Sequence, residues 1–297
     1  MNKVIFVFFY LGINLFRIIP FYILYKIGYV FYVIIYYLVG YRKSVVADNL
    51  SKCFSDKTIK EIKKLCKAFY KYNLSDIFVE GLKGFTMSQK QFHMRYKLLN
   101  PEILDEYYEN NQDVIAVASH YGNWEWGIQA VNGQLKHQAA ALYKPLSNKL
   151  IENYTKKLRE NSGMKLVSIY DTKEYFQSKK DKPVVYIMAA DQFPGGMMKK
   201  AIWVDFLGRE TPCLHGPESY ARFNNLPLIF FDVKRVKRGF YEMEIVKLVD
   251  HPEKEDLGQI TAKYMHILEK TIMEKPENWL WTHKRWKVTK RDVIHSS

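Results

Sequence analysis

The sequence contains few cysteines, and none of them has the spacing of a redox or metal-binding motif. Cys53, Cys66 and Cys213 are scattered over 297 residues without a C-x-x-C pair. A disulfide framework and a structural zinc site are therefore not expected, and reduced thiols are the simpler interpretation. Cys213 precedes His215 by two residues, which allows a cysteine–histidine nucleophile pair, although nothing nearby supplies a third partner.

Several catalytic and cofactor-binding motifs are also missing. The chain has no H-E-x-x-H zinc helix, no P-loop and no G-x-G-x-x-G dinucleotide fingerprint. It also lacks G-x-S-x-G, the nucleophile elbow of hydrolases. We therefore expect no bound metal and no cofactor, and a catalytic base in this chain is expected to act on a nucleophile that the substrate supplies.

Negative charge is in short supply, with 31 acidic residues against 45 lysines and arginines and a net charge of +14. Such an excess predicts an acidic partner, which can be nucleic acid, an anionic membrane surface or an acidic carrier protein. Many tyrosines and phenylalanines fall in the first forty residues, which favours the membrane.

The N-terminal segment 4–40 is strongly apolar and is interrupted by Arg17, Pro20 and Lys26. From residue 18 to residue 40 it is long enough to span a bilayer, which takes about 20 residues. No small-residue cleavage site follows, so a signal peptide fits poorly. Arg42 and Lys43 favour keeping the rest of the chain in the cytoplasm. A spanning helix is preferred, and a helix lying in the interface is the alternative. We expect an anchor at residues 1–41 and a catalytic domain at 42–297.

The body of the chain begins with a helical pattern over residues 56–83 and then alternates between strands and helices. This alternation predicts βαβ units, hence an α/β fold with a mixed, mainly parallel sheet flanked by helices. The expected strands are 113–118, 139–143, 166–169, 184–189, 227–233 and 240–248, and the expected helices are 123–132, 147–161, 172–179, 217–224 and one from about 255.

The candidate site lies just beyond the strand at 113–118, where the chain reads His120-Tyr121-Gly122-Asn123-Trp124-Glu125. A turn there can bring the Glu125 carboxylate back to His120, so that Glu125 orients a general base. Gly122 and Asn123 permit a tight turn into a helix, whose free N–H groups can face an oxyanion or a phosphate.

Further polar residues follow other strands of the predicted sheet. Tyr143 and Lys144 follow one strand, and Asp191 and Gln192 follow another. In a parallel sheet these loops share one edge, so the side chains can converge on the same site.

The chain resembles a known family in a series of ordered blocks. The block from His120 to Glu125 is similar to the H-G-N-W-E block of the late (lauroyl/myristoyl) acyltransferases of lipid A biosynthesis, within the lysophospholipid acyltransferase superfamily with its H-x4-D/E motif. The resemblance runs from about residue 40 to 288. Its other blocks are Arg42 with Asn49, Leu50 and Phe54; Tyr143–Asn148; Arg159 and Gly163; Asp191 and Gln192; Phe206–Gly208, a mild departure from F-F-G; and Trp281–Lys287.

The resemblance implies transfer of an acyl chain from an acyl carrier protein thioester, or from acyl-CoA, to a hydroxyl of a lipid A precursor. His120 would be the general base and Glu125 its orienting carboxylate. Arg159 would stabilise the oxyanion, with the backbone N–H groups of Gly122 and Asn123 as the competing source. The resemblance also implies a second group of residues that bind the oxyanion or the substrate, or orient the site: Asp191, Gln192, Tyr143 and Lys144.

Three basic residues near the C-terminus, Lys284, Arg285 and Lys287, alternate with tryptophans and are expected to bind phosphates at the membrane surface, or else to lie on a solvated helix face. The expected location is the bacterial inner membrane, with the catalytic domain facing the cytoplasm.

Two other functions remain open at this point. The same chemistry could serve a lysophospholipid or an amino-acid lipid. A basic membrane adaptor or a nucleic-acid binder would fit the charge but not the ordered polar blocks, and the sequence carries no nucleic-acid motif, so no nucleic-acid partner is expected.

Overall fold

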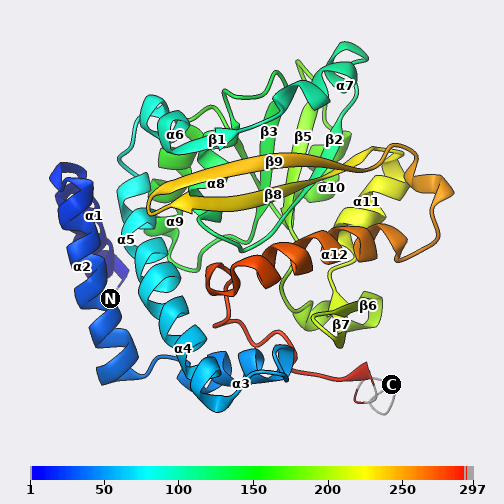
Figure 1. Cartoon of the computed structure of the whole chain (residues 1–297). Coiled ribbons are helices and arrows are strands. Elements are labelled where there is room, and N and C mark those ends of the chain that lie inside the picture. The colour runs from blue at the N-terminus through cyan, green and yellow to red at the C-terminus, as the bar shows by residue number, and fades with distance from the viewer. Residues whose placement is uncertain (1, 291, 293–297) are drawn as a thin grey trace.

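Strand β2 (Val114–Ala118) lies inside the central sheet of the computed structural model, which describes residues 2–290 and 292 (Figure 1). Its side chains are apolar on both faces and Val114 to Val117 are buried, as expected for a strand with neighbours on each side and helices above and below. Strand β5 (Val184–Ala189) pairs with β2 on one side, and β8 (Leu228–Lys237) pairs with it on the other.

The expected mixed, mainly parallel sheet is confirmed. Within the described residues seven strands follow one another in the order β1-β9-β8-β2-β5-β3-β4. Neighbouring strands are parallel except β8 and β9, which form an antiparallel hairpin. The remaining strands are β1 (Tyr96–Leu98), β3 (Gln138–Tyr143), β4 (Lys165–Ser168) and β9 (Phe240–Val249).

Helices cover both faces of the sheet, as right-handed crossovers require. Helices α8 (Trp124–Val131) and α9 (Lys149–Glu160) connect strands that advance in one direction along the sheet, so they share a face. The opposite face carries α10 (Thr172–Gln177), α11 (Gly216–Asn224) and α12 (Gln259–Glu274). Phe176 of α10 stacks on Tyr186 of β5 and on Tyr220 of α11, which fixes these two helices against the same face.

The apolar N-terminus forms two helices rather than one. Helix α1 (Asn2–Ile18) ends before Pro20, and α2 (Phe21–Val33) continues into a π-helical turn, η1 (Ile34–Val39). Proline lacks the N–H that a continuous helix needs, which explains the break. Among the described residues, Phe21–Val39 is the helix long and apolar enough to cross a membrane by length and composition. Both helices lie at one side of the molecule, along α5 (Ser75–Gly84) (Figure 1).

The helical pattern expected over 56–83 is present as a nearly continuous helical segment. It starts with a capping box between Thr58 and Glu61, runs through α4 (Ile59–Phe69), passes a π-helical turn η2 (Tyr70–Leu74) and ends with α5. Shorter elements flank this segment: α3 (Lys43–Cys53), α6 (Gln89–Arg95), η3 (Pro101–Leu104) and α7 (Asp105–Glu109).

A hairpin between β5 and α11 was not expected from the sequence. After the 3-10 segment η4 (Gly195–Lys200), β6 (Ile202–Phe206) and β7 (Arg209–Cys213) pair antiparallel across a turn at Leu207 and Gly208, both with positive φ. Two further 3-10 turns, η5 (Pro252–Lys254) and η6 (Pro276–Asn278), stand before and after α12.

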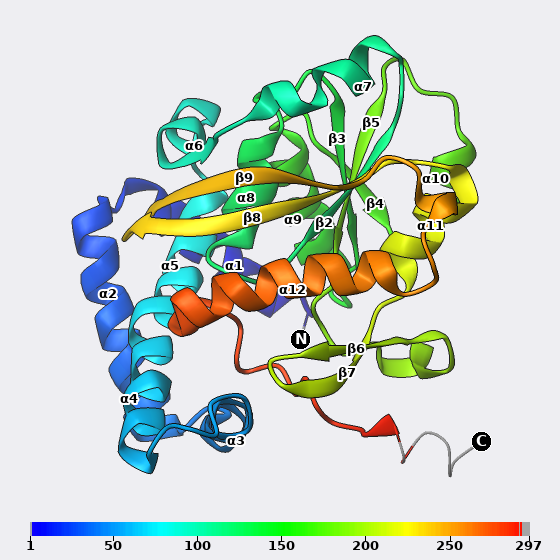
Figure 2. The ribbon, with the colours of Figure 1, turned by 45° about the vertical axis from the view of Figure 1, so that its right-hand side comes forward.

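The chain beyond α12 runs between α3 and the β6–β7 hairpin (Figure 2). Asn49 of α3, which is buried, donates to the carbonyls of Trp281 and His283 at 2.9 and 2.8 Å. Arg42 donates to the carbonyl of Thr282. On the other side, the guanidinium of Arg285 donates to the carbonyl of Pro212 in β7. The C-terminal segment is thus held by hydrogen bonds from both of its neighbours.

We expect Asn49→Ala to lower the free energy of unfolding by about 1–3 kcal/mol, because it leaves buried carbonyl groups without their donor. Thermal unfolding followed by circular dichroism would measure this loss. The exposed Asn110→Ala is the matched control. An equal effect of the two substitutions would contradict a stabilising role for the hydrogen bonds from Asn49 to Trp281 and His283, which we call the Asn49 clamp.

Candidate functional site

His120 and Asp191 lie side by side because of the register of two parallel strands. Ala118 of β2 pairs with Ala189 of β5, and each polar residue stands two positions beyond its own member of this pair. His120 Nδ1 lies 2.6 Å from Asp191 Oδ1, and the backbone N–H of His120 donates to Asp191 Oδ2 at 2.9 Å. The expected convergence of polar residues at this sheet edge therefore includes His120 and Asp191.

Asp191 also accepts a hydrogen bond from Trp279 in the C-terminal segment, with its indole N–H 2.8 Å from Oδ2. Burial raises the pKa of Asp191, but the charge of His120 and the donors around the carboxylate outweigh burial and lower that pKa to about 2. Asp191 is thus a stable anion inside the protein.

Burial and the neighbouring negative charges shift the pKa of His120 in opposite directions. Burial lowers it, while the charge of Asp191, the hydrogen bond to Asp191 and, to a smaller extent, the charge of Glu125 hold it above its ordinary value of 6.5. With Nδ1 facing the carboxylate, the neutral imidazole carries its proton on Nδ1 and presents Nε2 as the basic atom.

The turn after His120 is held by the C-terminal segment. Gly122 has a φ of +59°, and a side chain there would come within 3.2 Å of Val233. The N–H of Gly122 donates to the carbonyl of Asn278 at 2.8 Å, and the N–H of Leu280 donates to the carbonyl of His120. Because the N–H of Gly122 already has a partner, it is not a free oxyanion donor in this arrangement.

Asn123 caps α8 and is fully buried. Its side-chain oxygen accepts from the N–H of Trp126 at 3.0 Å, while its amide nitrogen donates to Glu80 at 2.7 Å. The side chain of Asn123 therefore shapes the turn from within rather than facing a ligand.

Glu125 makes its direct contact with Arg159 rather than with His120. The guanidinium of Arg159 on α9 lies 2.6 Å from Glu125 Oε2, and both side chains are partly exposed. The expectation that Glu125 folds back onto the imidazole thus differs from the arrangement observed, in which Asp191 occupies Nδ1. The first turn of α8 directs Glu125 toward α9, where an opposite charge is available.

Tyr143, Lys144 and Gln192 are not part of the His120 contacts. The hydroxyl of Tyr143 donates to Glu152 of α9 at 2.5 Å, and the same carboxylate accepts from the N–H of Leu146. This pairing fixes the loop that leads into α9. Lys144 is exposed, and Gln192 is half-buried beside Asp191.

The three basic residues near the C-terminus differ in their exposure to solvent. Lys284 and Lys287 are exposed, as a surface role requires. Arg285 is fully buried, and its guanidinium contacts the carbonyl of Pro212 and the sulfur of Cys213. The expectation that Arg285 binds phosphate at the membrane surface is therefore wrong, because its side chain closes the core against β7.

The cysteine–histidine pair considered from the sequence is not an activated nucleophile. Cys213 is buried, and burial raises the pKa of its thiol despite the nearby charge of Arg285. A thiol that stays protonated is a poor nucleophile. In the described part of the chain, no cluster of three or more histidine, cysteine, aspartate or glutamate side chains could hold a metal ion.

Sequence reasoning missed two residues close to His120, namely Trp279 and His283. His283 accepts the N–H of Phe193 at 2.9 Å through Nε2 and so ties the C-terminal segment to the loop after Asp191. Burial, followed by the positive charge of Arg285, lowers the pKa of His283 to about 4, so this ring is a neutral acceptor. The block Trp281–Lys287 pointed to this segment, but nothing in it showed which side chains turn inward.

An apolar cavity of about 40 Å³ adjoins the site on the α8 face of the sheet. Its lining residues include Ser119 and Trp124, which stand on either side of His120 in the sequence, and Tyr96 of β1 and Met243 of β9. The ring of Trp124 lies edge-on to the imidazole of His120, with the two centroids 5.0 Å apart. The site thus combines a histidine–carboxylate pair with an adjoining apolar space.

The comparisons with known proteins point to one family. Residues 2–288 match the model of the bacterial lipid A biosynthesis acyltransferases. The chain is 26% identical to a lipid A biosynthesis acyltransferase of Haemophilus influenzae, over 94% of this chain and 90% of that protein. It is 24% identical to the lipid A biosynthesis palmitoleoyltransferase of Escherichia coli and 22% identical to the lauroyltransferase of the same organism, over 86% and 85% of this chain and 81% of each protein.

We expect Asp191→Asn to lower the pKa of His120 below 6.5, because burial then dominates over the remaining charge of Glu125. NMR titration of the His120 ring would measure the shift. The exposed Asp205→Asn makes the same chemical change elsewhere and should leave the titration of His120 where it is in the unsubstituted protein; equal shifts would contradict the pairing.

The same pair predicts a pH window for stability. A raised His120 pKa contributes stability that is complete below about 6.5 and lost as the pH rises through the folded value. A lowered Asp191 pKa contributes stability that is present above its ordinary value of 3.8 and lost as the pH falls toward 2. Denaturant unfolding would measure the difference in unfolding free energy between the unsubstituted protein and Asp191→Asn. This difference should be largest between pH 3.8 and pH 6.5 and should shrink at lower and at higher pH.

Proposed function

Because the chain belongs to the family of bacterial lipid A biosynthesis acyltransferases, which are O-acyltransferases, we propose that it moves a fatty acyl chain from an acyl carrier protein thioester to a hydroxyl of a lipid A precursor. The observation that carries this proposal is the pairing of His120 with Asp191 at a sheet edge, next to an apolar cavity. When a lipid hydroxyl attacks an acyl thioester, a base must accept the hydroxyl proton and an apolar space must hold the acyl chain.

In the proposed reaction, His120 Nε2 takes the proton of the acceptor hydroxyl while its oxygen attacks the thioester carbonyl. The tetrahedral intermediate then collapses, the carbon–sulfur bond breaks, and the imidazolium returns the proton to the leaving thiolate. Asp191 holds the Nδ1–H and stabilises the cationic ring through both steps, as the carboxylate of a catalytic triad does. General-base help of this kind is worth about 10²–10⁴-fold in rate.

Glu125 and Arg159 are proposed to act as a charged pair beside the base. The charge of Glu125 favours the protonated form of His120, and its contact with Arg159 fixes where that guanidinium lies. An arginine retains further N–H donors when one of them is paired, so Arg159 can still donate to the oxyanion. The engagement of the Gly122 N–H by Asn278 favours Arg159 over that backbone donor.

The apolar cavity is proposed to be the start of the acyl-chain site. At about 40 Å³ it holds little more than a water molecule, so side chains must move when an acyl chain enters. Its walls are mostly aliphatic and aromatic side chains that differ in size, so their volumes would set which chain length fits.

The charge of the chain and its apolar N-terminus support the proposed donor and the proposed location. A net charge of +14 suits an acidic carrier protein and an anionic membrane surface. Exposed apolar side chains along α1, α2 and η1, among them Phe8, Leu11 and Leu38, suit attachment to a membrane. We propose that the protein lies at the bacterial inner membrane with its catalytic domain facing the cytoplasm.

Purified protein supplied with acyl carrier protein thioester and a tetra-acylated lipid A precursor should give a product heavier by one acyl chain, read by mass spectrometry. We expect His120→Ala to lower kcat by about 10²–10⁴-fold, because the proton acceptor is lost. Glu125→Ala should also lower kcat, since it removes a charge that favours the imidazolium.

The exposed His251→Ala is the matched control for the loss of a histidine. Unsubstituted protein that yields no acylated product would remove the proposed function, whereas full activity in His120→Ala would remove only the base assignment.

Ala141→Leu should shift the preference toward shorter acyl chains, because a larger side chain on β3 fills the apolar cavity. Competition among acyl donors of mixed length, read as the distribution of product masses, would measure the shift. Thermal unfolding of the variant checks that the larger residue leaves the fold intact. An unchanged distribution from a folded variant would mean that the acyl chain lies elsewhere.

A further inference from the structure

One face of α5 carries charged side chains that are buried in the protein. Asp76, Glu80 and Lys83 follow one another at helical spacing, and their exposed fractions are 0%, 0% and 7%. Buried charges are costly unless they are paired or hydrogen-bonded. The partners of these three residues are therefore informative about what α5 holds together.

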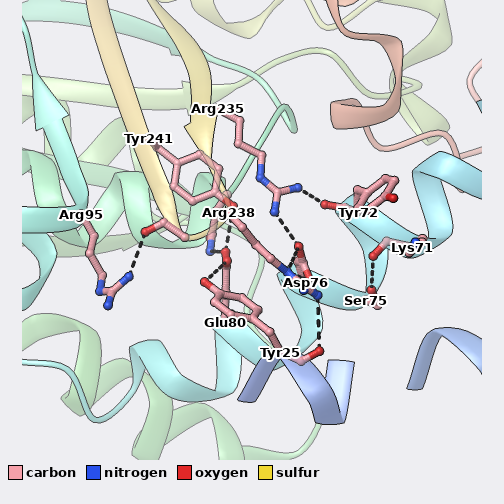
Figure 3. Close-up of polar contacts among 12 residues, drawn as sticks. Tyr25, Lys71, Tyr72, Ser75, Asp76, Glu80, Arg95, Arg235, Arg238 and Tyr241 are labelled. Carbon is pink, nitrogen blue, oxygen red and sulfur yellow. Dashed lines mark hydrogen bonds and ion pairs between the residues drawn. The ribbon is translucent and has the colours of Figure 1, made fainter. Parts of the chain in front are cut away.

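Glu80 lies at the centre of this group, between the sheet and α2, which we call the anchor helix (Figure 3). Its Oε1 accepts from the hydroxyl of Tyr25 on α2 at 2.8 Å, and its Oε2 accepts from the hydroxyl of Tyr241 on β9 at 2.8 Å. Oε2 also accepts from the amide of Asn123 at 2.7 Å. A single carboxylate thus joins helix α2, strand β9 and the turn after His120.

The contact with Asn123 reaches the site through the cap of α8. With its amide nitrogen on Glu80, Asn123 turns its oxygen toward the N–H of Trp126, so the carboxylate fixes which way the cap points. The backbone carbonyl of Glu80 accepts the indole N–H of Trp126 at 2.8 Å as well. Glu125 lies in the helical turn between these two contacts, so its position depends on them.

The other charged residues of this face hold the anchor helices in place. Asp76 binds Arg235 and Arg238 of the β8–β9 hairpin, and the Arg238 guanidinium lies over the ring of Tyr25, 4.4 Å from its centroid (Figure 3). Lys83 donates to the carbonyls of Phe16, Arg17 and Ile19 at the end of α1, at 2.8–2.9 Å.

We propose that Glu80 is a positioning residue that couples the anchor helix α2, through Tyr25, to the turn that carries His120 and Glu125. The coupling runs from the Tyr25 hydroxyl to the carboxylate, from the carboxylate to the Asn123 amide, and from that amide to the first turn of α8. The turn from His120 to Glu125 therefore keeps its observed geometry when α2 is packed against α5 and Tyr25 binds Glu80. This inference deepens the proposed function and rests on it.

The test uses Glu80→Gln, Tyr25→Phe and a matched control, Tyr22→Phe, in the full-length protein. Glutamine keeps the shape of the side chain but replaces one of its two accepting oxygens with a donor, so the three groups that donate to Glu80 cannot all keep their present hydrogen bonds. Tyr25→Phe removes one hydroxyl on the anchor side and leaves Asn123 untouched. Tyr22 lies on the same helix, is 66% exposed and undergoes the same chemical change.

We expect Glu80→Gln to lower kcat by about 10–100-fold, the size of loss that a small misplacement of catalytic groups causes, with KM changed by less than about twofold. Tyr25→Phe should lower kcat in the same direction by a smaller factor, and Tyr22→Phe should leave it unchanged. In an Asn123→Ala background the effect of Glu80→Gln should largely disappear, because the link through which it acts is gone.

Hydrogen exchange of the backbone amides at 120–127 gives a readout that needs no activity. Tyr25→Phe should speed exchange there relative to Tyr22→Phe, since the cap of α8 loosens, and equal exchange in the two variants would overturn the coupling. Unsubstituted protein without acylated product would remove the proposed function and leave this exchange comparison intact. Normal kcat in a folded Tyr25→Phe and Glu80→Gln would overturn the positioning role.

Discussion

The site depends on the hydrogen bonds that the carboxylate of Asp191 accepts from His120 and Trp279. This carboxylate lies at the end of β5, it holds both the backbone and the ring of His120 at the end of β2, and it accepts the indole of Trp279 from the C-terminal segment. Three parts of the chain that are far apart in the sequence meet at this one group. Its burial makes each of these hydrogen bonds stronger than it would be in water, and makes the loss of any of them more costly.

The residues around this carboxylate are supported by a second set of buried polar groups. Asn49 and Arg42 bind the carbonyls of the segment from Trp281 to His283, and Arg285 closes the same segment against β7. Among the blocks in which the sequence resembles the family, His120–Glu125 and Asp191 lie at the site, whereas Arg42–Phe54 and Trp281–Lys287 hold the segment that completes it.

Much of the sheet could be predicted from the sequence, because β2, β3 and β5 are short apolar runs bounded by polar residues. The same pattern placed His120 and Asp191 at strand ends. It could not show that they are bonded, since that depends on the register of Ala118 with Ala189, which no local signal reports.

The partner of His120 and the environment of Arg285 were harder to predict for the same reason. Glu125 is near His120 in sequence, but the first turn of α8 carries it to Arg159 on another helix. Arg285 is a charged residue between tryptophans, a pattern typical of a surface. Its burial depends on the Pro212 carbonyl and the Cys213 sulfur of β7, in a hairpin that was not expected. Both differences arise from long-range contacts that spacing along the chain does not encode.

The clamp of Asn49 on His283 also sets an order of events during synthesis. The two residues are 234 positions apart, and a ribosome that adds about 5–20 residues per second needs roughly 12–47 s to cover that distance. The apolar helices α1 and α2 emerge long before the segment that completes the site. The two apolar helices have therefore left the ribosome while the residues that meet at Asp191 are still unassembled, because Trp279 and the segment after it are among the last to be made.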